Sequence, residues 1–187
     1  MGARKLLIVD LEATCWDRPE HASERMETIE IGALCIDVES SAAPREFQTF
    51  VRPVREPRLS EYCTRLTSIR QDDVDAAQPF AVEFGKFLQW IGDPTSVRFA
   101  SWGGYDRQQL LRDCAHHRVA FPFGEDHLNL KHHCSAKLGS RPAGMAQALS
   151  KAGIELSGTH HRALDDARNI WRLVQRTSGS ELAALVR

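Results

Sequence analysis

Long apolar stretches are missing from this 187-residue sequence. Apolar runs such as residues 6–9 (LLIV) are far shorter than the roughly 20 residues that a membrane-spanning helix needs. The N-terminus also lacks an apolar stretch long enough for a signal peptide. We therefore expect a cytoplasmic protein that does not associate with membranes.

A surplus of charge is missing too, because 24 Lys and Arg residues face 25 Asp and Glu residues and leave a formal charge of −1. Proteins that coat duplex DNA neutralise many phosphates with a large cationic surface, and this sequence does not supply one. A protein that binds nucleic acid at one small site is still compatible with this charge. The 42% hydrophobic and 26% charged fractions are ordinary for a globular protein.

Paired cysteine motifs are absent, since the five cysteines are odd in number, widely spaced and form no CxxC pair. We expect reduced, mostly buried thiols. Histidines occur in three adjacent pairs, but neighbours in sequence point to different faces, so a structural zinc site is not favoured. The pairs are His116-His117, His132-His133 and His160-His161.

The order of the expected elements predicts an α/β sandwich with a mixed sheet. Strands are expected at 5–12, 27–38, 46–51 and 97–102, with a charged, proline-containing loop at 16–25. Helices are expected at 60–66, 79–91, 105–117, 128–138, 144–152 and 163–176. We predict a single domain over 1–187, with its core at about 5–176 and a tail at 177–187.

Three of these elements place carboxylates on faces that should be buried. Alternation along the first strand puts Asp10 and Glu12 on the same face as its apolar residues. Taken alone, this pair is also compatible with a strand that ends in solvent. In the last helix Asp166 lies within the apolar stripe, whereas Asp165 faces water, so Asp166 needs a metal or a buried cation as partner.

Asp106 repeats this pattern, because it shares a helix face with Leu110 and Cys114. Its alternative explanation is an acid favoured by the helix dipole in the first turn. Together the carboxylates suit a divalent-ion cluster, and the lack of thiolates favours Mg²⁺ or Mn²⁺. Four carboxylates can hold two such ions, and His161 or the adjacent His160 could accept a proton from water.

The ordered motifs DLEAT (10–14), Asp106 within SWGGYD, and His161 with Asp166 as H-x4-D resemble the DEDDh exonucleases. The similarity covers residues 5–176. It extends to the histone-mRNA 3′-end exonucleases and their bacterial relatives through DLEATCW, Glu30-Ile31-Gly32 and YCTRLTSI. The resemblance implies a ribonuclease H-like three-layer sandwich with a central mixed five-stranded sheet. It also implies hydrolysis of nucleic acid from the 3′ end, releasing 5′-mononucleotides.

The resemblance also assigns roles to individual residues. It implies that four acids hold two Mg²⁺ or Mn²⁺ ions and that His161, rather than His160, is the general base. The resemblance also implies that five further residues contact the substrate, some of them by stacking on its terminal base. The two tyrosines among them could instead be core residues. The acids are Asp10, Glu12, Asp106 and Asp166, and the substrate-binding residues are Tyr62, Leu66, Tyr105, Ala13 and Thr14.

Together these inferences predict a metal-dependent 3′→5′ exonuclease that acts on the ends of single-stranded RNA, with single-stranded DNA as an alternative. The rival functions are a DNA-trimming or proofreading exonuclease, a phosphodiesterase for short oligonucleotides, and a catalytically silent interaction or RNA-binding module. Ser68 stands where these enzymes commonly have glycine, and Gly103-Gly104 precede Tyr105, so both bear on substrate preference. Substrate selection would come from the cleft itself or from a partner protein.

Overall fold

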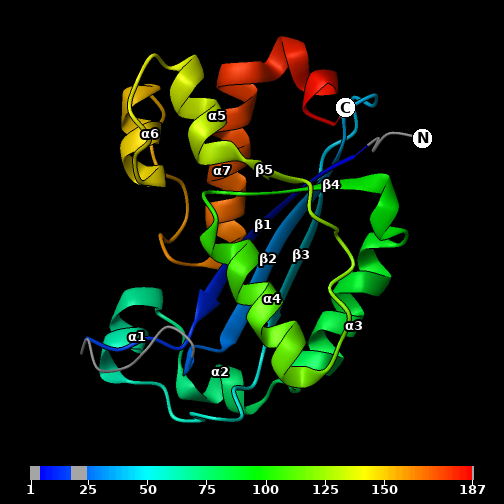
Figure 1. Ribbon diagram of the computed structural model, residues 1–187. Helices are drawn as coiled ribbons and strands as arrows, with labels where there is room; N and C mark the ends of the chain where they lie inside the picture. Colours follow the sequence, from blue (N-terminus) through cyan, green and yellow to red (C-terminus); the bar gives the residue numbers. More distant parts are fainter. Residues whose placement is uncertain (1–4, 18–24, 187) are drawn as a thin grey trace.

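A mixed sheet of five strands, ordered β3-β2-β1-β4-β5, forms the centre of the protein (Figure 1). The computed structural model describes residues 5–17 and 25–186. Strand β1 pairs antiparallel with β2 and parallel with β4, β2 and β3 are antiparallel, and β4 and β5 are parallel. The strands are β1 Lys5–Ala13, β2 Thr28–Asp37, β3 Arg45–Phe50, β4 Val97–Ser101 and β5 His127–Asn129.

Helices cover both faces of this sheet and make three layers (Figure 1). Leu6 and Ile8 of β1 pack on the side of α5, α6 and α7, while Leu7 and Val9 pack on the side of α3 and α4. The helices are α1 Glu61–Thr67, α2 Gln71–Asp75, α3 Phe80–Ile91, α4 Tyr105–His117, α5 Leu130–Lys137, α6 Met145–Lys151 and α7 Ala163–Ser178, with 3₁₀ turns η2 Pro94–Ser96 and η3 Gly179–Val186. The α/β sandwich and its mixed sheet are therefore confirmed.

One predicted boundary is wrong. The helix expected from residue 128 begins only at Leu130, because residues 127–129 pair with 99–101 as strand β5. Three residues are too few to show an alternating pattern, so the strand escaped detection. Helix α2 and turn η3 were not foreseen, and residues 18–24 of the expected loop lie outside the described residues.

Gly32 in β2 allows α7 to approach the sheet. A Cβ at this position would lie only 2.1 Å from the carbonyl carbon of Ala163 at the start of α7. Glu30, two residues earlier and fully buried, accepts hydrogen bonds from the Ala163 N–H and from the Arg162 side chain. The first turn of α7 is thereby fixed against the middle of the sheet.

Ser68 adopts a left-handed conformation (φ 62°) at the C-terminal end of α1. A glycine is commonly favoured there because it has no Cβ to clash in this conformation. The presence of serine in place of the common glycine at position 68 therefore affects how helix α1 ends. Within residues 5–17 and 25–186, no helix combines the length and the apolar character that crossing a bilayer requires.

Candidate active site

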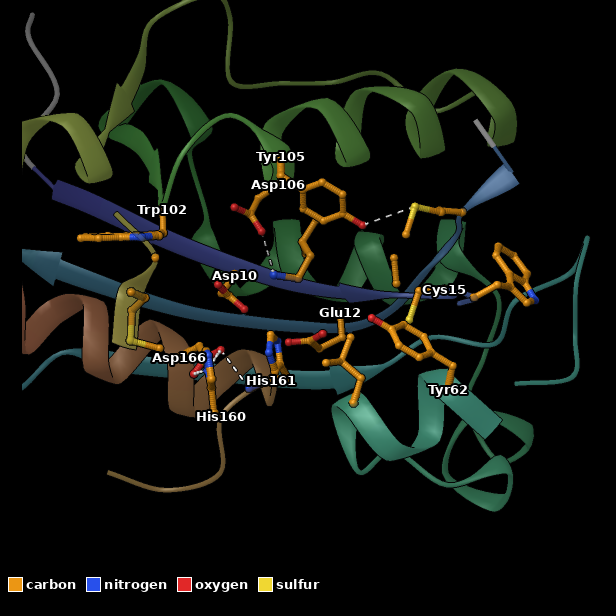
Figure 2. A pocket seen from close by; sticks show the side chains of 17 residues that line it. Asp10, Glu12, Cys15, Tyr62, Trp102, Tyr105, Asp106, His160, His161 and Asp166 are labelled. Atoms are coloured by element: carbon orange, nitrogen blue, oxygen red, sulfur yellow. Dashed lines mark hydrogen bonds and ion pairs between the residues drawn. The ribbon is translucent and has the colours of Figure 1, made fainter. Parts of the chain in front are cut away.

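A cavity of about 570 Å³ opens where the end of β1 meets the start of α4 and the approach to α7. All four predicted metal-binding acids line it, together with both histidines of the pair at 160–161 (Figure 2). Of the predicted substrate-binding residues, Ala13, Tyr62, Leu66 and Tyr105 line it too. The fold brings together residues that lie 95 positions apart in the sequence. The Leu11 N–H, for example, donates a hydrogen bond to the Asp106 carboxylate.

Three of the carboxylates converge closely. One oxygen each from Asp10, Glu12 and Asp166 lies within 4.8 Å of the others. Glu12 and Asp166 are buried, at 8% and 5% exposure, and Asp106 completes the acidic wall at 4%. The prediction that Asp166 faces inward is confirmed, whereas Asp165 pairs with Arg168 on the outer side.

This crowding disfavours the charged forms of the acids. Burial and the carboxylates of Asp106 and Glu12 raise the pKa of Asp10 well above its usual value. Burial and the nearby Asp166 raise the pKa of Glu12 from 4.5 to about 9. Burial raises the pKa of Asp106 from 3.8 to about 7, although hydrogen bonds such as that from the Leu11 N–H oppose the shift. Raised pKa values of this kind arise where buried carboxylates crowd together without enough positive charge nearby to compensate them.

The two histidines of the pair make different contacts with Asp166. Nδ1 of His160 lies 3.0 Å from Oδ2 of Asp166, while His161 donates its backbone N–H to the same oxygen at 3.0 Å. Their rings stack with centroids 4.0 Å apart. His161 holds a left-handed conformation (φ 62°), which strains a residue with a side chain. A ring nitrogen of His161 lies within 4.8 Å of an Asp166 oxygen, but within residues 5–17 and 25–186 the hydrogen bond of His161 to that carboxylate comes from its backbone N–H.

Burial and the neighbouring His160 lower the pKa of His161 below its usual value. A neutral imidazole can accept a proton near pH 7. His161 is thus suited to act as a base. The ring of His160, the other candidate for this role, lies within hydrogen-bonding distance of Asp166.

Tyr105 and Tyr62 flank the apolar part of the cavity. Tyr105, the first residue of α4, is 43% exposed, and its hydroxyl contacts Sδ of Met26. Tyr62 and Leu66 project from α1 and pack with Cys15 and Met26 (Figure 2). Thr14 is not brought to the cavity, because it is buried and its hydroxyl accepts a hydrogen bond from the Glu27 N–H.

Comparison with known proteins assigns the family. The exonuclease (RNase T) family model matches residues 7–174. The chain belongs to the exonuclease family. The nuclease domain of 3′hExo, described as a DEDDh family member bound to rAMP, superimposes on this exonuclease fold with a TM-score of 0.87, at 26% identity over 99% of this chain and 96% of that one. This agreement confirms the ribonuclease H-like fold that the motifs implied.

Several curated members of the exonuclease family are also similar. Zebrafish (Danio rerio) ERI1 exoribonuclease 2 is 33% identical over 95% of this chain and 36% of its own length. The 3′-5′ exonuclease Snipper of Drosophila melanogaster is 28% identical over 90% of this chain and 67% of its own length. The chain thus spans about a third of the length of the first of these relatives.

Exonucleases of this family generally use divalent metal ions, and the acidic wall fits such ions. Its donors are carboxylate oxygens, which hard divalent cations prefer. Cys15, which also lines the cavity, is a poor ligand because contact with Cys63 and burial raise the pKa of its thiol. Arg162 does not neutralise the wall, since its side chain is paired with Glu30.

The sequence missed the supporting role of Glu30 and several residues that line the cavity. Glu30 was noted only as part of a motif, although a glutamate within an apolar strand signals a buried partner, here Arg162. Trp102, Gly144 and Met145 line the cavity beside the acids. No periodicity marks these three residues, because they lie in or next to turns that only the tertiary structure brings to the site.

We expect the metal-free protein to lose stability as pH rises from about 4.5 to about 9, the interval over which Glu12 titrates differently in the unfolded and folded chains. The folded state binds more protons in this interval, so the free energy of unfolding falls with pH. Each unit by which the pKa of a group differs between the folded and unfolded states corresponds to about 1.4 kcal/mol in the free energy of unfolding. Denaturant unfolding in EDTA at several pH values measures the slope.

Glu12→Gln is the comparison for this measurement, because it removes the titrating group while nearly preserving its shape. The variant should show a shallower fall, and so should the wild-type protein with saturating Mg²⁺. A free energy of unfolding that rises between these pH values in EDTA would contradict the prediction.

Proposed function

We propose that the protein is a divalent-metal-dependent 3′→5′ exonuclease that hydrolyses single-stranded RNA from its end and releases 5′-mononucleotides. One observation carries the proposal: four inward-facing carboxylates and the imidazole of His161 share a cavity with two tyrosines. Support also comes from relatives named as 3′-5′ exoribonucleases and from the fold shared with a nuclease domain bound to rAMP.

In this proposal the acidic wall holds two Mg²⁺ or Mn²⁺ ions. The ligands would be Asp10, Glu12, Asp106 and Asp166. When bound, the ions would activate water and stabilise the charge that develops on the departing oxygen. The raised pKa values of Glu12 and Asp106 support cation binding, because a cation relieves the repulsion that raises them.

The protein's own groups orient the reaction. His161 accepts the proton of the attacking water through its ring, while its backbone N–H and the ring of His160 hold Asp166 in place. Tyr105 and Tyr62 stack on the terminal base, a contact that tolerates all four bases. The bond between phosphorus and the 3′-oxygen breaks, and the terminal nucleotide leaves with its 5′-phosphate.

RNA is favoured as the substrate because similar proteins carry the name exoribonuclease and a similar 3′-exonuclease is described in recognition of a histone mRNA stem-loop. Single-stranded DNA is the alternative, since Snipper is named without reference to RNA. The proposal includes a single catalytic domain that works in the cytoplasm, with a partner protein aiding substrate choice.

A 5′-labelled single-stranded RNA oligomer tests the proposal. With Mn²⁺ or Mg²⁺ the label should pass through a ladder of products shortened from the 3′ end, and EDTA should stop the reaction. Activity that persists in EDTA, or cleavage that begins within the chain, would overturn it. The same sequence as DNA measures sugar preference, and a steep fall in rate with length would favour the oligonucleotide phosphodiesterase.

A further inference from the structure

The cavity extends from the acids in two directions along β1. Beyond Glu12, Tyr62 and Leu66 belong to an apolar cluster that includes Cys15. At the opposite end, Trp102 and Met145 belong to the core cluster under α7. Figure 2 shows Trp102 on one side of Asp10 and Asp106 and Tyr62 on the other. The acids therefore separate two apolar lobes.

Hydrogen bonds hold Trp102 and the turn that carries it at this end of the cavity. It follows directly on Ser101, the last residue of β4, whose hydroxyl donates a hydrogen bond to the Gly103 carbonyl. Its indole N–H donates to the Ala143 carbonyl at 3.1 Å. One edge of the indole is thus fixed while its ring remains partly exposed on the cavity wall. A ring fixed in this way is preorganised for stacking.

A cation lies near this lobe. The side chain of Lys131, from α5, passes next to Gly103, within 3.8 Å of where a Cβ would stand. Lys131 forms no ion pair within residues 5–17 and 25–186, so its charge is available to a phosphate. Positively charged side chains and stacking aromatic rings together bind single-stranded nucleic acid.

We propose that Trp102 stacks on the base of the penultimate nucleotide and thereby positions the phosphodiester bond over the acids. This inference rests on the proposed function. The bond that is hydrolysed joins the last two nucleotides and lies at the acids. The terminal nucleoside therefore occupies the lobe of Tyr62 and Tyr105, and the penultimate nucleoside lies toward Trp102. The ligand of this second lobe is the base of either a purine or a pyrimidine nucleotide.

Three substrates test the role of Trp102. The methyl ester of a nucleoside 5′-monophosphate carries only the terminal nucleoside, because its leaving group has no ring to stack on Trp102, and an RNA oligomer fills both lobes. The third substrate is the same oligomer with a reduced abasic residue at the penultimate position. For Trp102→Ala we expect kcat/KM to fall about 10–100-fold on the oligomer, as for loss of one stacked base, and to stay unchanged on the ester.

The abasic oligomer should slow the wild-type protein by a similar factor and should slow Trp102→Ala no further. Trp102→Phe should restore most of the rate, because it keeps a stacking ring. Tyr62→Ala provides the contrast, since it should impair the ester and the oligomer alike. Thermal unfolding establishes that each variant is folded.

Two results would overturn the inference while leaving the exonuclease activity standing. One is a Trp102→Ala variant that is equally impaired on the ester, which would indicate a purely structural role. The other is a variant as fast as wild type on the oligomer. A wild-type protein that cleaves none of the substrates with Mn²⁺ present would overturn the proposed function, and the inference with it.

Discussion

An Asp166→Asn variant is expected to degrade single-stranded RNA at least about 100-fold more slowly than the wild-type protein, since removing even an indirect support of a metal site costs 10–100-fold. The residue is buried against Asp10 and Glu12, so the substitution removes a charge from the point where three carboxylates converge. Metal-free stability should not fall, because burial raises the pKa of Asp166. Initial rates and thermal unfolding in EDTA measure the two effects.

Asp165→Asn is the matched control, because it makes the same change one residue earlier. Asp165 pairs with Arg168 and accepts a hydrogen bond from the Thr159 N–H, on the outer side of α7. It should alter stability slightly and leave activity within about threefold of wild type, because Asp165 does not line the cavity and substitutions away from such features usually change the free energy by no more than about 0.5 kcal/mol. Equal activity of Asp166→Asn and wild type would contradict the metal-site assignment.

A His161→Asn variant is expected to lose about 10²–10⁴-fold in kcat, the usual contribution of a positioned general base. Burial and His160 lower the pKa of His161, so the wild-type protein should be active with a neutral imidazole at pH 7 and should lose activity only below about pH 6.5. With Mg²⁺ or Mn²⁺ kept saturating at each pH, so that protonation of Glu12 and Asp106 does not limit metal binding, the variant should lose this dependence on pH. Rates of the wild-type protein and of His161→Asn, measured between pH 5 and 8, test this prediction.

His160→Asn separates the two members of the pair. Its ring holds the Asp166 carboxylate, so we expect a loss of about 10–100-fold and a weaker response to Mg²⁺, with the pH dependence retained. A pH profile that disappears in His160→Asn and persists in His161→Asn would exchange the two roles.

The acids of the site were predictable because each lies on an element with a clear period. Alternation in β1 assigned Asp10 and Glu12 to the side that meets α7, and the helical period of α7 separated Asp166 from Asp165. A charge on an apolar face requires a partner, so the pattern itself pointed to a shared site. The order of the motifs along the sequence then carried the resemblance to DEDDh exonucleases.

The rest of the site depends on contacts between distant segments. Strand β5 exists only because residues 127–129 find β4 as a partner. Trp102 reaches the cavity through a turn whose position is set by a hydrogen bond to Ala143, 41 residues away. The different contacts of His160 and His161 with Asp166 accompany a left-handed backbone at His161 that no local sequence period signals.

That left-handed conformation at His161 makes a chemical rescue experiment feasible. A φ of 62° is one that glycine adopts without strain, so His161→Gly should keep the backbone N–H that holds Asp166 while leaving a space where the ring was. Imidazole added to the solution could fill this space and accept the proton in place of the missing side chain. Recovery of rate with imidazole concentration in His161→Gly, and its absence in Asp166→Asn, would distinguish a missing base from a missing metal ligand.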